Sequence, residues 1–265
     1  MSHNLSGFFA MTDGLDGVGK GTVEIAILDS LKEKGFRVFD QVAYEIENRA
    51  KPDFLDRESK WYVDLNDFDV IYMGEPGEAG TGFDLRYEVI KKSNKGKYDA
   101  RETLSFYSND RLINIRRNLI PALEAGKIII KSRGLPASCC YQQLQAENEG
   151  NPLSYDEILS YSGNSLTLEY PPDILIIPTI KNPDDLIARL DKRDKQDDCQ
   201  FETIEFQIGL KPRFESKELR ELFEKAGSKV TYIDAGISIE ESKRQAIDSF
   251  NSVFEPYLTK RNSQK

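Results

Sequence analysis

The chain has very little histidine and cysteine, and this scarcity excludes several kinds of chemistry. Among its 265 residues there are one histidine, His3, and three cysteines, Cys139, Cys140 and Cys199. A Ser-His-Asp or Cys-His mechanism and a histidine zinc site therefore do not fit the sequence. An odd number of cysteines, two of them adjacent, is more typical of reduced thiols than of a disulfide framework. Phosphoryl transfer needs none of these groups, because positioning, Lys and Arg charge and magnesium stabilise its transition state.

Long apolar runs and a surplus of positive charge are also lacking. No stretch approaches the roughly 20 apolar residues that span a bilayer, and the first residues, MSHNLSG, lack the charged and apolar regions of a signal peptide. The formal net charge is -9, whereas duplex nucleic acid is bound by basic surfaces. We therefore expect a cytoplasmic protein that binds neither membranes nor duplex nucleic acid. Its 39% of hydrophobic residues suffices for a packed core.

The stretch FFAMTDGLDGVGKGT, residues 8–22, carries the clearest functional signal. An apolar strand leads into a glycine-rich turn that ends Gly-Lys-Gly-Thr, and a helical pattern follows over residues 23–34. In this order, backbone N–H groups and a helix N-terminus can converge on a phosphate while the lysine adds positive charge. A glycine-rich turn that binds nothing is the alternative. The predicted ATP-binding residues are Gly14, Gly17, Val18, Gly19, Lys20, Gly21 and Thr22.

Strand and helix patterns alternate from one end of the chain to the other. This alternation predicts an α/β fold, a doubly wound parallel sheet with helices on both faces, as one domain over residues 1–265. Together with the glycine-rich turn it indicates the P-loop NTPase type. Residues 127–131 and 171–179 are apolar runs typical of strands buried on both faces. We also expect a strand over residues 36–44 and helices over 83–93 and 100–125. The charged residues 45–69 are predicted to be an insertion, either a solvated loop or a lid or subunit contact.

Four stretches, in this order, resemble the thymidylate kinase family of P-loop nucleoside monophosphate kinases. They are DGLDGVGKGT, Glu75-Pro76-Gly77 with Gly80-Thr81, LSFYSNDRLINI and IPALEAGKIIIKSRGLPASCCYQ. The resemblance covers most of the chain and implies that ATP and dTMP give ADP and dTDP, with Mg²⁺ carried on ATP. The alternatives are a kinase of another nucleoside monophosphate or of a nucleoside, and a nucleotide-binding protein that has lost phosphoryl transfer. Family members are commonly dimers, so a homodimer is a further expectation.

The resemblance also implies roles for individual residues. The catalytic residues would be Lys20, Arg133, Arg189 and Arg193, the last two in a lid over residues 189–202 that closes on the transferred group. The acceptor nucleotide would be bound by Asp16, Glu75, Phe106, Arg111, Arg133, Ser138, Tyr141 and Gln142. In this set Phe106 would stack on the base, while Arg111 and Arg133 would grip the phosphate. A core phenylalanine, salt bridges and a solvated helix end are the ordinary alternatives for these side chains.

Four positions depart from the family pattern. Gly21 follows the lysine where a hydroxyl normally holds magnesium, and Ser132 stands where the family has an aspartate before the arginine. Gly74 replaces an arginine before Glu75, and Glu78 replaces a glycine and adds negative charge near an anion site. The sequence therefore predicts a divergent member and leaves the metal ligands unknown.

Overall fold

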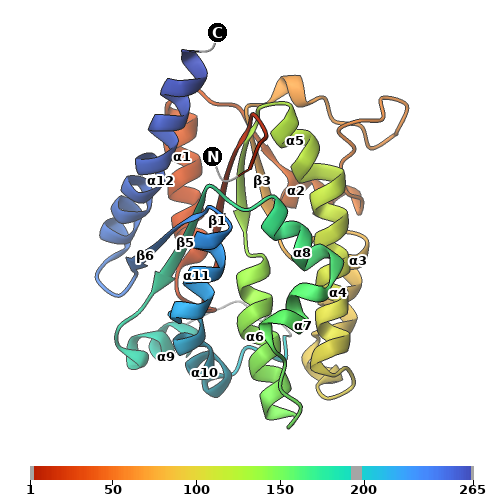
Figure 1. Ribbon diagram of the computed structural model, residues 1–265, viewed down its shortest axis with the longest axis vertical. Coiled ribbons are helices and arrows are strands. Elements are labelled where there is room, and N and C mark those ends of the chain that lie inside the picture. Colours follow the sequence, from red (N-terminus) through yellow and green to blue (C-terminus); the bar gives the residue numbers. More distant parts are fainter. Residues whose placement is uncertain (1–2, 192–198, 264–265) are drawn as a thin grey trace.

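The computed structural model describes residues 3–191 and 199–263, which form a parallel sheet between two layers of helices (Figure 1). The sheet in this part of the chain has the strand order β2-β3-β4-β1-β5-β6. All neighbouring strands pair in parallel. The strands are β1 (Phe8–Thr12), β2 (Val38–Asp40), β3 (Val70–Gly74), β4 (Ile128–Ser132), β5 (Ile174–Thr179) and β6 (Lys229–Asp234). This architecture confirms the predicted α/β doubly wound sheet.

Helices cover both faces of the sheet. Helices α1 (Lys20–Glu33) and α12 (Ile239–Asn262) lie on one face, and α4 (Ala100–Asn114) and α6 (Leu135–Asn148) lie on the other (Figure 1). The other helices are α2 (Gln41–Asn48), α3 (Thr81–Asp84), α5 (Ile120–Glu124), α7 (Tyr155–Ser160), α8 (Ser162–Glu169), α9 (Pro183–Asp191), α10 (Ile204–Phe214) and α11 (Lys217–Lys225). Short helical turns occur at Leu65–Asp67, Leu85–Val89, Lys92–Asn94 and Ile115–Leu119. Within the described residues, no helix combines the length and apolar character needed to cross a membrane.

The core lies between the sheet and each helical layer. In β4, the consecutive residues Ile128, Ile129 and Ile130 are all buried, as expected for a parallel strand covered on both faces. On the side of α12, the ring of Phe8 packs against those of Phe250 and Phe254, at centroid distances of 5.6 and 5.1 Å. This aromatic cluster fixes the C-terminal helix on the first strand, which leads into the glycine-rich turn.

Some predicted elements differ from the structure. The strand expected over residues 36–44 ends at Asp40, because its carboxylate accepts a hydrogen bond from the N–H of Ala43 and caps α2. The start of the predicted insertion 45–69 is therefore helical as far as Asn48. The helix expected over residues 83–93 begins at Thr81 and is divided into short pieces. The sequence patterns did not predict α7, α8 and α10.

The N-terminal segment is held by the fold. His3 is 5% exposed, and its Nε2 lies 3.4 Å from Oδ2 of Asp173, at the start of β5. The same carboxylate accepts a hydrogen bond from the N–H of Phe9 at 2.9 Å. The single histidine therefore lies at the amino ends of the strands. Ligands in such folds bind at the opposite, carboxyl ends.

We predict that truncating Phe254 will destabilise the protein. Its side chain is fully buried in the aromatic cluster, so Phe254→Ala should lower the free energy of unfolding by about 3–5 kcal/mol. Urea unfolding followed by circular dichroism measures this change. The control Ile25→Ala, at a position 56% exposed on α1, should change stability by no more than about 0.5 kcal/mol. Equal losses for the two variants would show that α12 is not held as described.

Candidate functional site

The predicted functional segments meet at one edge of the sheet. The glycine-rich turn follows β1, Glu75 follows β3, and Arg133 follows β4. These three strands are neighbours in the order β3-β4-β1, so their carboxyl ends lie side by side. In open α/β sheets, ligands bind outside these ends. The sheet thus gathers residues from three distant parts of the sequence at the position where a ligand would bind.

The turn after β1 has the backbone shape of a phosphate-binding loop. Gly14, Gly17 and Gly19 have φ angles of 150°, 74° and 100°, which residues with a side chain rarely adopt. The ammonium of Lys20 donates a hydrogen bond to the carbonyl of Gly14 at 3.0 Å. Burial lowers the pKa of Lys20 to about 8, and the charge of Arg133 acts in the same direction. An anion bound in the loop would favour the charged lysine and reverse this shift.

A buried carboxylate, Asp13, fixes the start of the loop. It accepts hydrogen bonds from the N–H groups of Gly14 at 2.8 Å and of Gly134 and Ala137 at 3.0 Å. Burial raises the pKa of Asp13, and the charge of Arg133 opposes this shift. The end of β1 is therefore bound to the beginning of α6, and the two loops on this edge hold a fixed relative position.

A second carboxylate, Asp16, lies within the loop and gathers several predicted residues. It accepts hydrogen bonds from the hydroxyl of Tyr141 at 2.9 Å and from Nε2 of Gln207 at 3.1 Å. It also forms ion pairs with Arg133 and, at 3.7 Å, with Lys20. Asp16 thus brings the phosphate-loop lysine and the arginine after β4 to the same point.

Arg133 occupies a strained and half-buried position. Its φ angle of 65° lies in the left-handed region, a conformation that costs energy and is concentrated at functional sites. Burial opposes its charge, but Asp16 and Tyr141 hold the pKa of Arg133 well above its usual value. The guanidinium therefore remains charged beside the loop.

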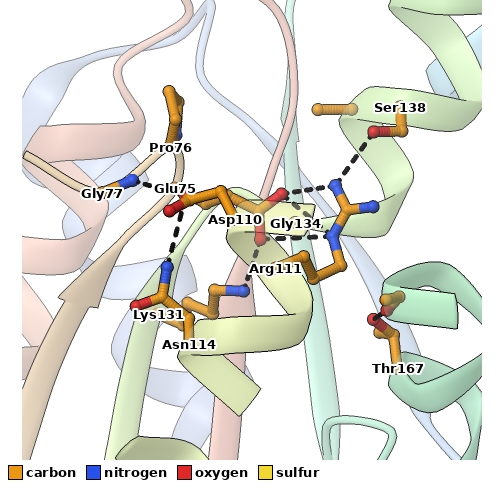
Figure 2. A network of polar contacts seen from close by, with 12 residues as sticks. Glu75, Pro76, Gly77, Asp110, Arg111, Asn114, Lys131, Gly134, Ser138 and Thr167 are labelled. Carbon is orange, nitrogen blue, oxygen red and sulfur yellow. Dashed lines mark hydrogen bonds and ion pairs between the residues drawn. The ribbon is translucent and has the colours of Figure 1, made fainter. Parts of the chain in front are cut away.

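A network of buried charges forms at the end of β3 (Figure 2). Oε1 of Glu75 lies 3.0 Å from Nε of Arg111, and Oε2 lies 2.7 Å from Nζ of Lys131. Arg111 also donates to Oγ of Ser138 at 2.9 Å and to the side-chain oxygen of Asn164. Burial favours the neutral form of Glu75, but Arg111 and Lys131 lower its pKa to about 2. Arg111 is 1% exposed, so its guanidinium supports the site from within the protein.

The loop that follows Glu75 is packed against the insertion. Lys51 of the insertion lies 3.1 Å from Oδ1 of Asp110 and donates to Asn114 at 3.1 Å. The same Asp110 accepts a hydrogen bond from the N–H of Gly77 at 2.8 Å (Figure 2). A Cβ atom on Gly77 would lie 2.4 Å from Nζ of Lys51, so a side chain here would displace the lysine from the loop. The insertion therefore supports the Glu-Pro-Gly loop through a buried lysine.

The extra negative charge of Glu78 is neutralised locally. Its carboxylate lies 3.0 Å from Nη2 of Arg86, which also donates to the carbonyl of Pro76 at 2.6 Å. Because a cation meets this carboxylate, its repulsion toward a bound phosphate is reduced.

The two aromatic residues of the FYSNDR stretch face different surroundings. The ring of Phe106 packs against that of Tyr98, with a centroid distance of 6.2 Å. Tyr107 lies one helical turn before Arg111 and hence on the same side of α4. Burial raises the pKa of Tyr107, and the charge of Arg133 opposes that shift. Tyr107 therefore lies within the electrostatic influence of Arg133, on the side of α4 that carries Arg111.

The remaining predicted residues come from α6 and α9. Gln142 lies one turn after Ser138, is 1% exposed, and has an Nε2 with no hydrogen-bond partner among the described residues. Arg189 donates to the carbonyl of Ala235 at 2.6 Å and to that of Val18 in the glycine-rich turn at 3.5 Å. Arg193 and residues 192–198 of the expected lid lie outside the described residues.

Gln207 and Glu24 are among the residues of this edge that the sequence analysis did not identify. Gln207 of α10 donates to Asp16 and accepts from the N–H of that residue at 2.8 Å. Glu24 of α1 is 2% exposed and accepts a hydrogen bond from the hydroxyl of Tyr72 at 2.9 Å. Burial raises the pKa of Glu24. In the described part of the chain, no group of three or more His, Cys, Asp or Glu side chains could hold a metal ion.

We predict that Glu75→Gln will destabilise the protein strongly, because it leaves Arg111 and Lys131 buried without their anion. The free energy of unfolding at neutral pH should fall by about 3–5 kcal/mol. The carboxylate has a pKa of about 2, against an ordinary value of 4.5. Its stabilisation is therefore complete above about pH 4.5 and is lost as the pH falls toward 2.

Denaturant unfolding at several pH values tests this prediction. The difference between the original chain and Glu75→Gln should shrink as the pH falls below about 4.5. The control Glu88→Gln removes a carboxylate whose side chain is 47% exposed and should leave the stability nearly unchanged. A difference for Glu75→Gln that is independent of pH would contradict the assignment.

Comparison with known proteins identifies the family of the chain. The thymidylate kinase family model matches residues 64–246. A thymidylate kinase of Exiguobacterium is 24% identical over 249 residues, which cover 92% of this chain and 94% of the relative. A probable thymidylate kinase of Archaeoglobus fulgidus is 24% identical over 242 residues, 90% of this chain and 93% of that protein. One from Staphylothermus marinus is 30% identical over 145 residues, 55% of this chain and 54% of its own length.

A solved structure has the same fold. The thymidylate kinase of Candida albicans superposes with a TM-score of 0.59 at 15% identity, over 94% of this chain and 93% of that chain. The family model spans well over half of the sequence and includes the segments that build the Glu75 network and the Arg133 strand end. The chain belongs to the thymidylate kinase family, as its motifs predicted.

Proposed function

We propose that the protein transfers the γ-phosphoryl group of ATP to a nucleoside monophosphate, most directly dTMP, and so forms ADP and dTDP. The observation that carries this proposal is the juxtaposition of Lys20 in the phosphate loop with Arg133 after β4, both paired with Asp16. One cation suits the phosphates of the donor and the other suits the phosphate of the acceptor. A cytoplasmic location, a homodimer and a lack of affinity for duplex nucleic acid remain part of this proposal.

The phosphate loop would hold ATP through its backbone N–H groups and the ammonium of Lys20. An oxygen of the acceptor phosphate then bonds to the γ-phosphorus of ATP, while the bond from that phosphorus to the oxygen of ADP breaks. The attacking oxygen is already ionised, so no protein base is needed. Arg133, together with Arg189 beside the loop, would neutralise charge on the group in transfer.

Magnesium that arrives with ATP would lower the negative charge of the phosphates. Mg²⁺ prefers oxygen ligands, and near the loop Thr22 and the buried carboxyl of Glu24 offer them. One carboxyl oxygen of Glu24 lacks a hydrogen-bond partner among the described residues, which fits a role toward a cation.

The acceptor base would lie between α4 and α6. Tyr107, on the side of α4 that carries Arg111, would stack on the base, in place of Phe106. Gln142 has a buried Nε2 without a partner in the described residues, and a carbonyl of the base would satisfy it. Ser138, which accepts from Arg111, lies on the same side of α6. These groups would select the base, while Glu75 keeps Arg111 in place.

Steady-state phosphorylation of a panel of nucleoside monophosphates and nucleosides tests the activity. We expect turnover of dTMP with ATP and Mg²⁺, and a fall of about 10²–10³ in kcat for Lys20→Ala, which removes a charged donor to the transferred group. The control Lys32→Ala, whose side chain is 56% exposed on the same helix, should keep full activity. No turnover of any compound of the panel would refute the proposal.

The acceptor site is tested by two neighbouring substitutions on α4. Tyr107→Ala should raise the KM for the acceptor, since base stacking on an aromatic side chain is worth roughly 1–3 kcal/mol. Phe106→Ala, which removes the ring that packs against Tyr98, should leave this KM nearly unchanged while lowering stability. The reverse order of the two KM values would return the stacking role to Phe106.

A further inference from the structure

Helix α1 carries a buried carboxyl group that phosphate binding leaves unexplained. Glu24 lies one helical turn after Lys20, on the same side of α1, and is 2% exposed. Its Oε2 accepts a hydrogen bond from the hydroxyl of Tyr72 at 2.9 Å. Its Oε1 is buried and has no hydrogen-bond partner within the described residues. A carboxyl oxygen in this state points to a ligand that the protein itself does not supply.

The position of Glu24 is unfavourable without such a ligand. A buried polar atom that lacks a partner destabilises the folded state, and more so if it is charged. The cations of Lys20 and Arg133 act on the carboxyl from a distance, and no ion pair to Glu24 is formed among the residues that the structure describes. Replacing this glutamate by an apolar residue would remove the cost, so its presence calls for a function.

The surroundings of Glu24 coincide with the two places where this chain departs from the metal-handling pattern. Ser132, at the end of β4, lies close enough to Glu24 for its hydroxyl to lower the pKa of that carboxyl, but it forms no hydrogen bond to Oε1 among the described residues. Gly21, three residues before Glu24, has no side chain, and a Cβ placed there would meet no atom within 4 Å. The carboxyl of Glu24 thus lies near Ser132 at the end of β4 and one turn into α1 from Gly21. These are the two positions where the chain lacks the side chains that order magnesium in the family pattern.

We propose that Glu24 is the positioning carboxylate for the Mg²⁺ of bound Mg·ATP, in place of the aspartate that the family pattern has at the position of Ser132. The inference rests on the proposed kinase function. The ligand class is a hydrated divalent cation, which keeps several of its waters when it binds to proteins with a nucleotide. Glu24 would orient those waters by accepting their hydrogen bonds, while Tyr72 holds the other carboxyl oxygen and fixes its direction.

Glu24→Gln tests the proposal, because it keeps the shape of the side chain and removes its charge. Calorimetric titration of a non-hydrolysable ATP analogue, at a series of Mg²⁺ concentrations and in EDTA, separates metal binding from nucleotide binding. We expect the apparent affinity for Mg²⁺ to fall about 10–100-fold and the affinity in EDTA to stay unchanged. Electron paramagnetic resonance of Mn²⁺ in the same ternary complex should show a matching loss of bound metal.

Two further variants distinguish a metal role from a purely structural one. Ser132→Asp in the Glu24→Gln background returns a carboxylate to the strand end and should restore most of the Mg²⁺ affinity. Tyr72→Phe removes only the hydrogen bond to Glu24 and should weaken Mg²⁺ binding less than Glu24→Gln does.

The outcomes are decisive because the assay contains no acceptor and needs no turnover. Unchanged Mg²⁺ affinity in Glu24→Gln, an equal loss of binding in EDTA, or no rescue by Ser132→Asp would overturn the proposal. Failure of Glu24→Gln to fold would also overturn it, since the carboxylate would then be needed for the fold itself. A lack of phosphoryl transfer in the original chain that still binds Mg·ATP would refute the proposed function and leave the role of Glu24 intact.

Discussion

The carboxylate of Glu75 is buried, and the need to pair this charge determines how the residues around the end of β3 are arranged. An isolated ionised carboxylate in a protein interior is very costly, so it must be paired and hydrogen-bonded. Glu75 meets this condition through Arg111 of α4 and Lys131 of β4. Arg111 in turn reaches Ser138 on α6 and Asn164 on α8. The end of β3 is thereby bound to three helices and a neighbouring strand, and the loop after it has little freedom to move.

At the phosphate loop, in contrast, carboxylates position side-chain cations that could bind an anion. Asp16 pairs with both Lys20 and Arg133, and Asp13 ties the end of β1 to the start of α6. Burial lowers the pKa of Lys20 to about 8, so Lys20 loses its positive charge at a lower pH than Arg133 does. A bound phosphate would stabilise that charge directly. The acidic residues of the loop therefore hold its cations in position before a ligand binds. A bound phosphate would add further negative charge beside the same cations.

Much of this arrangement could be predicted from the sequence, because it follows from patterns that are local. Apolar runs gave the central strands, and the residues directly after them had to meet at one edge. That Tyr107 and Arg111 lie on the same side of α4 follows from their spacing of four. Gln207 and Asn164 could not, because α10 and α8 lack a clear apolar periodicity and their partners lie far away in the sequence. The buried charge of Lys131 also escaped detection, since its anion follows a different strand.

The glycine at position 74 shows why departures from a family pattern must be examined together. A Cβ atom on Gly74 would lie 3.1 Å from a methyl group of Val42, so α2 occupies space that a larger side chain there would need. That helix begins at this place because Asp40 caps it, and it leads into the insertion whose Lys51 supports the loop at Gly77. The insertion supplies a buried cation to the Glu-Pro-Gly loop from outside the sheet, where the family pattern supplies one from the end of β3. A cation in that position fixes the loop through Asp110, while Arg133 after β4 is the arginine that lies beside the phosphate loop, paired with Asp16.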